Sequence, residues 1–146
     1  MIILDTDCLS LLERKSGVEF YRLTERLGEF QPGEITTTII TFEEQMRGWM
    51  AYLAKADSVE KQIIAYEKLN RFLENYRYIP VIKFDEKAGE TFKDLKKQKI
   101  RVGTMDLKIA SIAISQKTLL ISRNLSDYEQ IPNLRVEDWT KETYSN

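Results

Sequence analysis

The sequence predicts an α/β protein in which helices cover both faces of a central parallel sheet of four to five strands, a three-layer α/β/α arrangement. Short apolar runs typical of buried strands alternate with segments of helical periodicity, and no internal repeat or linker interrupts them. Alternation of this kind favours a parallel sheet covered by helices. With 146 residues, 42% of them hydrophobic, the chain is expected to form one domain over residues 1–146.

Each expected element follows from its local pattern. Five apolar runs are predicted to be strands: residues 1–4, 35–40, 79–84, 119–121 and 134–136. Helices are expected between them: a first ending near residues 15–17, a second ending at Gly28, one opening at Thr41, one over residues 59–78, one capped by Asp85 and one from Thr104 onward. The last is apolar nearly all round, so it should be covered on most sides.

The chain contains no histidine, and this absence excludes several kinds of catalytic site. Imidazole zinc ligands and nucleophiles activated by histidine are not available. The single cysteine, Cys8, has apolar neighbours and is expected to be a buried free thiol. The net charge of −1 means that nucleic-acid binding would need a local basic patch. No apolar run is long enough to span a membrane, and a cytoplasmic protein is expected.

Acidic residues follow the predicted strands at what should be one edge of the sheet, the edge where ligands bind in α/β proteins. Asp5 and Asp7 come directly after the first strand. The other polar residues in comparable places are Glu43, Glu44, Asp106, Asn124 and Asp127. Carboxylates without a basic partner repel one another, and oxygen ligands are those that Mg²⁺ and Mn²⁺ prefer. The pattern therefore indicates a metal-dependent site.

Most of these acids also have a purely structural explanation. Thr41 and Glu44 have the spacing of a capping box, Asp106 follows a possible Thr104 cap, and Asp127 could be a turn residue. Asp5 differs, because a carboxylate that directly ends a buried strand is expected to have no capping role there. Their joint placement, rather than any single residue, favours the metal site.

Five motifs follow one another along the chain: Leu4-Asp5-Thr6-Asp7, Thr41-Phe42-Glu43-Glu44 with Gly48, Thr104-Met105-Asp106-Leu107-Lys108-Ile109-Ala110, residues 120–128 and Leu134-Arg135-Val136-Glu137-Asp138-Trp139. Together they resemble PIN-domain ribonucleases, particularly VapC-type toxins, over essentially the whole chain. The resemblance implies a PIN-like fold and hydrolysis of RNA by a metal-activated water, leaving 5′-phosphate and 3′-hydroxyl ends. It also implies a VapB-like antitoxin partner and a homodimer.

By this resemblance, Asp5, Glu44, Asp106 and Asp127 hold one or two Mg²⁺ or Mn²⁺ ions. Thr6, Asp7, Ser122 and Asn124 are implied to support the site. The family often has asparagine where Asp7 stands, an aliphatic residue where Gln45 stands and threonine where Ser122 stands. Helical periodicity alone puts Glu43 nearer the apolar face, and only the family register selects Glu44 over it. The basic residues expected to contact RNA are Lys97, Lys99, Arg101 and Arg123.

Two other functions fit part of the pattern. The sequence Asp5-Thr6-Asp7 after an apolar strand also resembles the opening of haloacid-dehalogenase-type phosphatases, although no later paired-aspartate motif of that family is found. A non-enzymatic alternative is a receiver-like module in which Asp5 and Asp7 bind Mg²⁺ and Asp85 accepts a phosphoryl group. In such a module, Asp106 and Asp127 would have no shared function.

Overall fold

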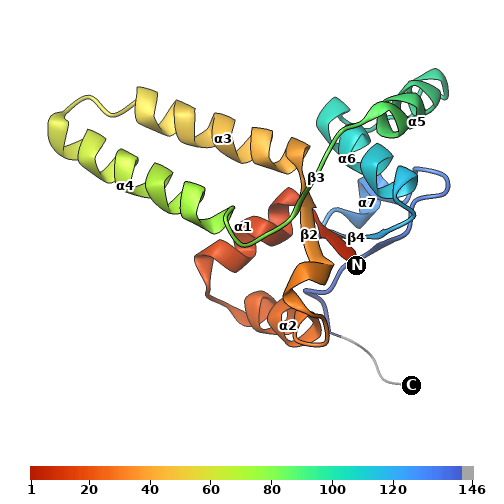
Figure 1. Ribbon diagram of the computed structural model, residues 1–146, viewed down its shortest axis with the longest axis horizontal. Helices are drawn as coiled ribbons and strands as arrows, with labels where there is room; N and C mark the ends of the chain where they lie inside the picture. Colours follow the sequence, from red (N-terminus) through yellow and green to blue (C-terminus); the bar gives the residue numbers. More distant parts are fainter. Residues whose placement is uncertain (143–146) are drawn as a thin grey trace.

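The computed structural model describes residues 1–142, and its centre is a five-stranded parallel sheet with the strand order β3-β2-β1-β4-β5 (Figure 1). The strands are β1 (Ile2–Leu4), β2 (Ile35–Thr38), β3 (Val81–Ile82), β4 (Leu119–Ile121) and β5 (Val136–Glu137). The predicted α/β fold with a parallel sheet of four to five strands is confirmed. Within the described residues, no helix is long and apolar enough to cross a membrane.

Helices connect the strands and cover the sheet (Figure 1). They are α1 (Thr6–Arg14), α2 (Val18–Leu27), α3 (Ile39–Ala54), α4 (Val59–Asn75), α5 (Glu86–Lys97), α6 (Thr104–Ser115) and α7 (Leu125–Tyr128), with a 3₁₀ turn over Pro32–Glu34. As predicted, the most apolar helix, α6, is buried along most of its length. The four-residue helix α7 was not predicted.

The alternation of side chains along β1 divides the core into two layers. Ile3 packs with α5, α6 and Tyr128 on one face of the sheet, whereas Ile2 and Leu4 pack with α1 and α2 on the other. Cys8 is fully buried in the second layer and has a free thiol, as predicted. Because β1 is central and buried on both faces, the residues that follow it are held by a rigid support.

Several predicted boundaries and two predicted helix caps are wrong. The strand predicted over residues 35–40 ends at Thr38, whose hydroxyl accepts a hydrogen bond from the Thr41 N–H at 3.1 Å. Thr38 is therefore the cap of α3, and Thr41 and Glu44 lie inside the helix. Helix α6 begins at Thr104 as predicted, but its N-cap is Gly103, so Thr104 is not the cap. The strand predicted over residues 79–84 shortens to Val81–Ile82, since Pro80 has no N–H to donate to a neighbouring strand.

The α3–α4 hairpin extends away from the rest of the molecule (Figure 1). Phe42 of α3 stacks on Phe72 of α4, with ring centroids 5.4 Å apart, and this contact holds the two helices together near the sheet. Other periodic apolar residues of α4 are exposed, with 56% exposure for Tyr66 and 62% for Leu73, which directly follows the buried Phe72. The helical pattern is thus present as predicted, but only part of its apolar face is buried.

Asp85 caps α5 as predicted, because its Oδ1 accepts a hydrogen bond from the Ala88 N–H at 3.0 Å. Substitution of this residue tests the contribution of the cap to stability. We expect Asp85→Ala to lower the free energy of unfolding by about 1 kcal/mol. Asp85→Ser, which keeps an acceptor, should cost much less. Urea denaturation followed by circular dichroism measures both, and equal stability of the three proteins would contradict the capping role.

Candidate active site

The sheet topology brings the predicted acids to one edge of the molecule. Asp5 follows β1, Asn124 and Asp127 follow β4, and Glu44 lies in the helix that follows β2; all three strands are parallel neighbours. Asp106 is in the first turn of α6. Hydrogen bonds link these segments directly, as described below. We refer to Asp5, Asp7, Glu44, Asp106 and Asp127 as the carboxylate cluster.

Asp5 is the most deeply buried acid of the carboxylate cluster, with 5% of its surface exposed. Its Oδ1 accepts a hydrogen bond from the Thr6 N–H at 2.9 Å, and its Oδ2 accepts one from the Ser122 hydroxyl at 2.7 Å. Asp5 is the N-cap of α1, so the expectation that it has no capping role is wrong. The hydroxyl of Ser122 in turn accepts from the Asn124 N–H at 3.0 Å, which ties the end of β4 to Asp5.

The two consecutive glutamates of α3 point to different surroundings. The Thr6 hydroxyl lies 2.8 Å from Glu44 Oε1 and donates to it, which places Glu44 beside the start of α1. Glu43 forms an ion pair with Arg47 one turn farther along the same helix. Successive helix positions are separated by about 100° around the axis, so both side chains cannot face the same neighbour. Of the two, Glu44 is the one directed toward the cluster.

Asn124 and Tyr128 connect the remaining acids. The Asn124 amide donates to Asp127 Oδ2 at 3.1 Å and to Asp106 Oδ2 at 3.4 Å. The Tyr128 hydroxyl lies 3.2 Å from both Asp5 Oδ1 and Asp106 Oδ1. Tyr128 was not among the predicted site residues, and its position directly after Asp127 is the only sequence signal that could have suggested it.

The two carboxylate oxygens of Asp7 have different surroundings. Its Oδ2 accepts a hydrogen bond from the Arg123 N–H at 3.0 Å. Its Oδ1 is buried and has no hydrogen-bond partner among residues 1–142. A buried carboxylate oxygen without a donor is costly, unless a cation or another donor approaches it.

The electrostatics of the cluster are dominated by burial and by repulsion between like charges. Burial raises the pKa of Asp5 to about 7, and the nearby charge of Asp7 adds to this effect. Burial also raises the pKa of Asp7, Glu44 and Asp106, and in the latter two the neighbouring carboxylates act in the same direction. These four acids therefore bind protons more tightly than they would in water, as expected of anions that lack a counterion.

The donor set fits a hard divalent cation. It consists of carboxylate, hydroxyl and amide oxygens, which are ligands for Mg²⁺ or Mn²⁺ rather than for zinc. The unpartnered Asp7 Oδ1 supports the same conclusion. Within residues 1–142, no three acidic or cysteine side chains are already gathered as a metal cage, because protein donors hold the carboxylates in the arrangement described above. A bound ion would have to compete with some of these hydrogen bonds.

The residues predicted to contact RNA lie in two places. Lys97, Lys99 and Arg101 are exposed around the connection between α5 and α6, shortly before Asp106 in sequence. Arg123 follows β4, but its guanidinium forms an ion pair with Glu19 of α2 at 2.8 Å. The structure therefore does not bring these four residues together as one patch through direct contacts.

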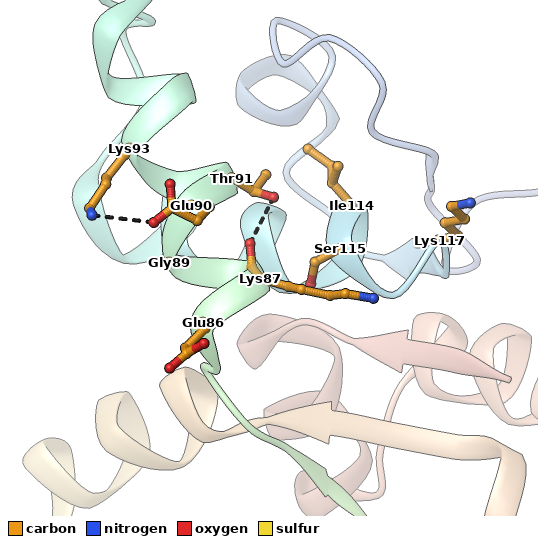
Figure 2. Close-up of a pocket in the computed structure, with 9 residues that line it drawn as sticks. All are labelled: Glu86, Lys87, Gly89, Glu90, Thr91, Lys93, Ile114, Ser115 and Lys117. Atoms are coloured by element: carbon orange, nitrogen blue, oxygen red, sulfur yellow. Dashed lines mark hydrogen bonds and ion pairs between the residues drawn. The ribbon is translucent and has the colours of Figure 1, made fainter.

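A surface hollow of about 820 Å³ lies outside this cluster, between the first half of α5 and the end of α6 (Figure 2). It shares no residue with the carboxylate cluster, and its lining residues are Glu86, Lys87, Gly89, Glu90, Thr91, Lys93, Ile114, Ser115 and Lys117. The charges of Glu90 and Lys93 in this hollow are paired with each other (Figure 2). We therefore place the active site at the carboxylate cluster.

Comparison with known proteins gives relatives over most of the chain, although no protein-family model matches it. Ribonuclease VapC1 of Haemophilus influenzae is 30% identical over 120 residues, covering 82% of this chain and 85% of that protein. Ribonuclease VapC2 of Rickettsia felis is 35% identical over 78 residues, covering 51% of this chain and 56% of that protein. The crystal structure of VapBC2 from Rickettsia felis bound to a DNA fragment from their promoter matches with a TM-score of 0.70 and 26% identity, covering 95% of this chain and 99% of that one.

The raised pKa of Asp5 predicts how stability depends on pH. Folding raises this pKa from 3.8 to about 7, so the folded state binds the proton more tightly. The carboxyl then contributes stability below its unfolded pKa, and this contribution is lost as the pH rises through 7. We expect Asp5→Asn to raise the free energy of unfolding of the metal-free protein by about 2 kcal/mol at pH 8, and by much less at pH 5.

Urea denaturation in EDTA at the two pH values measures this difference. Asp57→Asn, which removes an exposed carboxylate that is paired with Lys61 at 3.0 Å, is the matched control and should change stability little. A gain from Asp5→Asn that is the same at both pH values would contradict the assigned electrostatics.

Proposed function

The chain belongs to the VapC family of ribonucleases, and on that premise we propose that it is a metal-dependent endoribonuclease, the toxin of a toxin–antitoxin pair. The family resemblance predicted from the sequence motifs is confirmed by these relatives. The proposed reaction is hydrolysis of RNA phosphodiester bonds, with Mg²⁺ or Mn²⁺ as cofactor and with 5′-phosphate and 3′-hydroxyl products. RNA is the proposed substrate.

The observation that carries this proposal is the carboxylate cluster itself. Acids from segments far apart in sequence meet at one edge of the sheet, and the pKa of Asp5 is raised by burial and by its acidic neighbour. Such an arrangement destabilises the metal-free protein, and functional sites are where proteins retain such conflicts. A divalent cation would neutralise the repulsion and would also satisfy Asp7 Oδ1.

Each residue of the site has a proposed role. Asp5, Glu44, Asp106 and Asp127 would hold the cation. Asp7, whose charge acts on Asp5, Glu44 and Asp106, either adds a ligand or orients the others. When bound, the cation would supply activation of the attacking water and neutralisation of charge on the phosphate.

Three polar residues orient the carboxylates. Ser122 donates to Asp5, Thr6 donates to Glu44, and Asn124 donates to Asp106 and Asp127. Donors of this kind fix the direction of ligand oxygens and strongly affect metal affinity. These contacts support the roles that the family resemblance implies for the three residues.

The alternative functions fit the structure less well. In a phosphatase of the haloacid-dehalogenase type, Asp5 would attack phosphorus, but the chain lacks the later paired-aspartate motif of that family. In a receiver-like module, Asp85 would accept the phosphoryl group, but its carboxylate caps α5. The receiver-like module would also leave Asp106 and Asp127 without a shared function.

Binding of RNA is proposed to use the exposed cations near the site. Lys97, Lys99 and Arg101 are exposed cations, so they suit contact with the sugar–phosphate backbone. Arg123 would have to leave Glu19 to reach RNA. Because the net charge is −1, the affinity should depend strongly on local charge and on salt.

The exposed apolar surface of the α3–α4 hairpin supports a protein partner. It includes Met46 and Met50 of α3 and Tyr66 and Leu73 of α4, with exposures of 38%, 42%, 56% and 62%. Continuous apolar surfaces of this kind usually mark interaction sites. The related Rickettsia felis structure is a VapBC complex, and we propose that a VapB-like antitoxin packs on this surface and silences the enzyme. A homodimer is proposed as well.

The nuclease proposal is tested with Asp106→Asn. The substitution removes a negative charge but keeps an oxygen that can accept from Tyr128, so the fold should be retained. We expect RNA cleavage to fall at least about 100-fold, because a carboxylate ligand is lost. The measurement is cleavage of end-labelled transfer and ribosomal RNA with Mn²⁺, with Mg²⁺ and with EDTA.

Asp94→Asn, on the exposed surface of α5, is the matched control and should cleave like the unsubstituted chain. Activity in EDTA, or full activity of Asp106→Asn, would overturn the metal-dependent mechanism.

The antitoxin surface is tested with the double substitution Met50→Glu/Leu73→Glu. Buried charges would oppose packing of a partner, so inhibition of cleavage by the antitoxin should weaken at least about tenfold while cleavage itself is unchanged. Val18→Glu, at an apolar residue of α2 that is 59% exposed and outside the hairpin, is the control. Unchanged inhibition of the double variant would exclude this surface. Light scattering coupled to gel filtration measures the proposed homodimer independently.

A further inference from the structure

Tyr128 occupies an unusual place for a tyrosine. Its ring is fully buried in the core layer that contains Ile3, Leu107 and Leu120. The hydroxyl emerges from this layer beneath the carboxylate cluster, where it lies 3.2 Å from Asp5 Oδ1 and 3.2 Å from Asp106 Oδ1. The packed ring fixes the position of the hydroxyl, so the phenol acts as a rigid support for both acids.

The hydroxyl joins two acids that no other described hydrogen bond connects directly. Asp5 follows β1 and Asp106 lies on α6, so their separation depends on how a helix packs on the sheet. Asp5 has other donors, in Thr6 and Ser122. Asp106 has only one other side-chain donor among residues 1–142, Asn124 at 3.4 Å, which is a long contact. Tyr128 and Asn124 are therefore the two side-chain donors that restrain Asp106 within the described residues.

A hydroxyl is suited to this task because it carries a single hydrogen. It donates to one carboxylate at a time, and it leaves the other oxygen of each acid free of this contact. A lysine or arginine at the same place would neutralise the acids and compete with a cation. Tyr128 therefore lies between the two acids and can donate to either of them without adding charge.

We propose that Tyr128 is a positioning residue that fixes the spacing of Asp5 and Asp106 for a shared divalent cation. The proposal rests on the metal-dependent function proposed above and adds a residue to it. The hydroxyl acts through the two carboxylates and touches neither substrate nor water in the reaction. Its removal should therefore change cation affinity first, and cleavage only as a consequence.

Calorimetric titration of the full chain with Mn²⁺ tests this role. Tyr128→Phe keeps the packed ring and removes only the hydroxyl. Loss of a donor that orients ligand carboxylates should raise the Mn²⁺ dissociation constant by about 10- to 100-fold. Tyr76→Phe is the matched control, because the Tyr76 hydroxyl donates to Gln45 at 2.7 Å, outside the carboxylate cluster. Its dissociation constant should stay within about twofold of that of the unsubstituted chain.

Two further measurements separate positioning from support of the fold. Thermal unfolding in EDTA reports folding of each variant without the cation. Replacement of Tyr128 by 4-aminophenylalanine restores an N–H donor at the same place, and it should recover most of the lost affinity.

The outcomes are distinct. Unchanged Mn²⁺ affinity of Tyr128→Phe, with or without a lower melting temperature, would overturn the positioning role and leave the nuclease proposal standing. Failure of the amino analogue to recover affinity would also overturn it. Absence of Mn²⁺ binding by the unsubstituted chain would overturn the metal site and this role together.

Discussion

Repulsion between buried carboxylates is the constraint on which the rest of this site depends. A parallel sheet directs the ends of neighbouring strands to one edge, so acids that follow β1 and β4 must lie near each other. Burial leaves little water to separate their charges, and the pKa of Asp5 rises to about 7 as a result. The protein keeps this arrangement by surrounding the acids with hydroxyl and amide donors. These donors stabilise the carboxylates without cancelling the charge that a cation needs.

The donors come from elements that the sheet and the core hold in place. Ser122 follows β4 in the centre of the sheet, Thr6 begins α1, and Tyr128 is held by the core. The site is therefore oriented by the same contacts that stabilise the fold, and its geometry does not depend on an exposed loop. Asp7 is the exception, since one of its oxygens is buried without a donor among residues 1–142. The local conflict is thus concentrated next to Asp5.

Topology-based reasoning from sequence placed Asp5, Asp106 and Asp127 correctly, because the order of strands and helices alone determines which ends share an edge. The reasoning from sequence failed for features that depend on the three-dimensional arrangement of the elements. The strand-like run continues through Ile39 and Ile40 and hides the cap at Thr38. Glu43 and Glu44 are distinguished only by the direction in which α3 points them. Helix α7 is too short for a periodic pattern, so Tyr128 remained unassigned. The apolar residues of α4 recur at the spacing typical of a buried helix face, and this spacing is the same whether or not another element covers them.

The burial of Cys8 has a practical consequence. Cys8 is fully buried in the core layer that contains α1 and α2, and burial together with the nearby Asp7 raises the pKa of its thiol, so little reactive thiolate forms at neutral pH. A cysteine introduced on the surface, for instance at the tip of the α3–α4 hairpin, would be the preferred target of maleimide dyes or spin labels. Fluorescence or paramagnetic distance measurements could thus be made on variants of the natural chain, and Cys8 would not have to be replaced first.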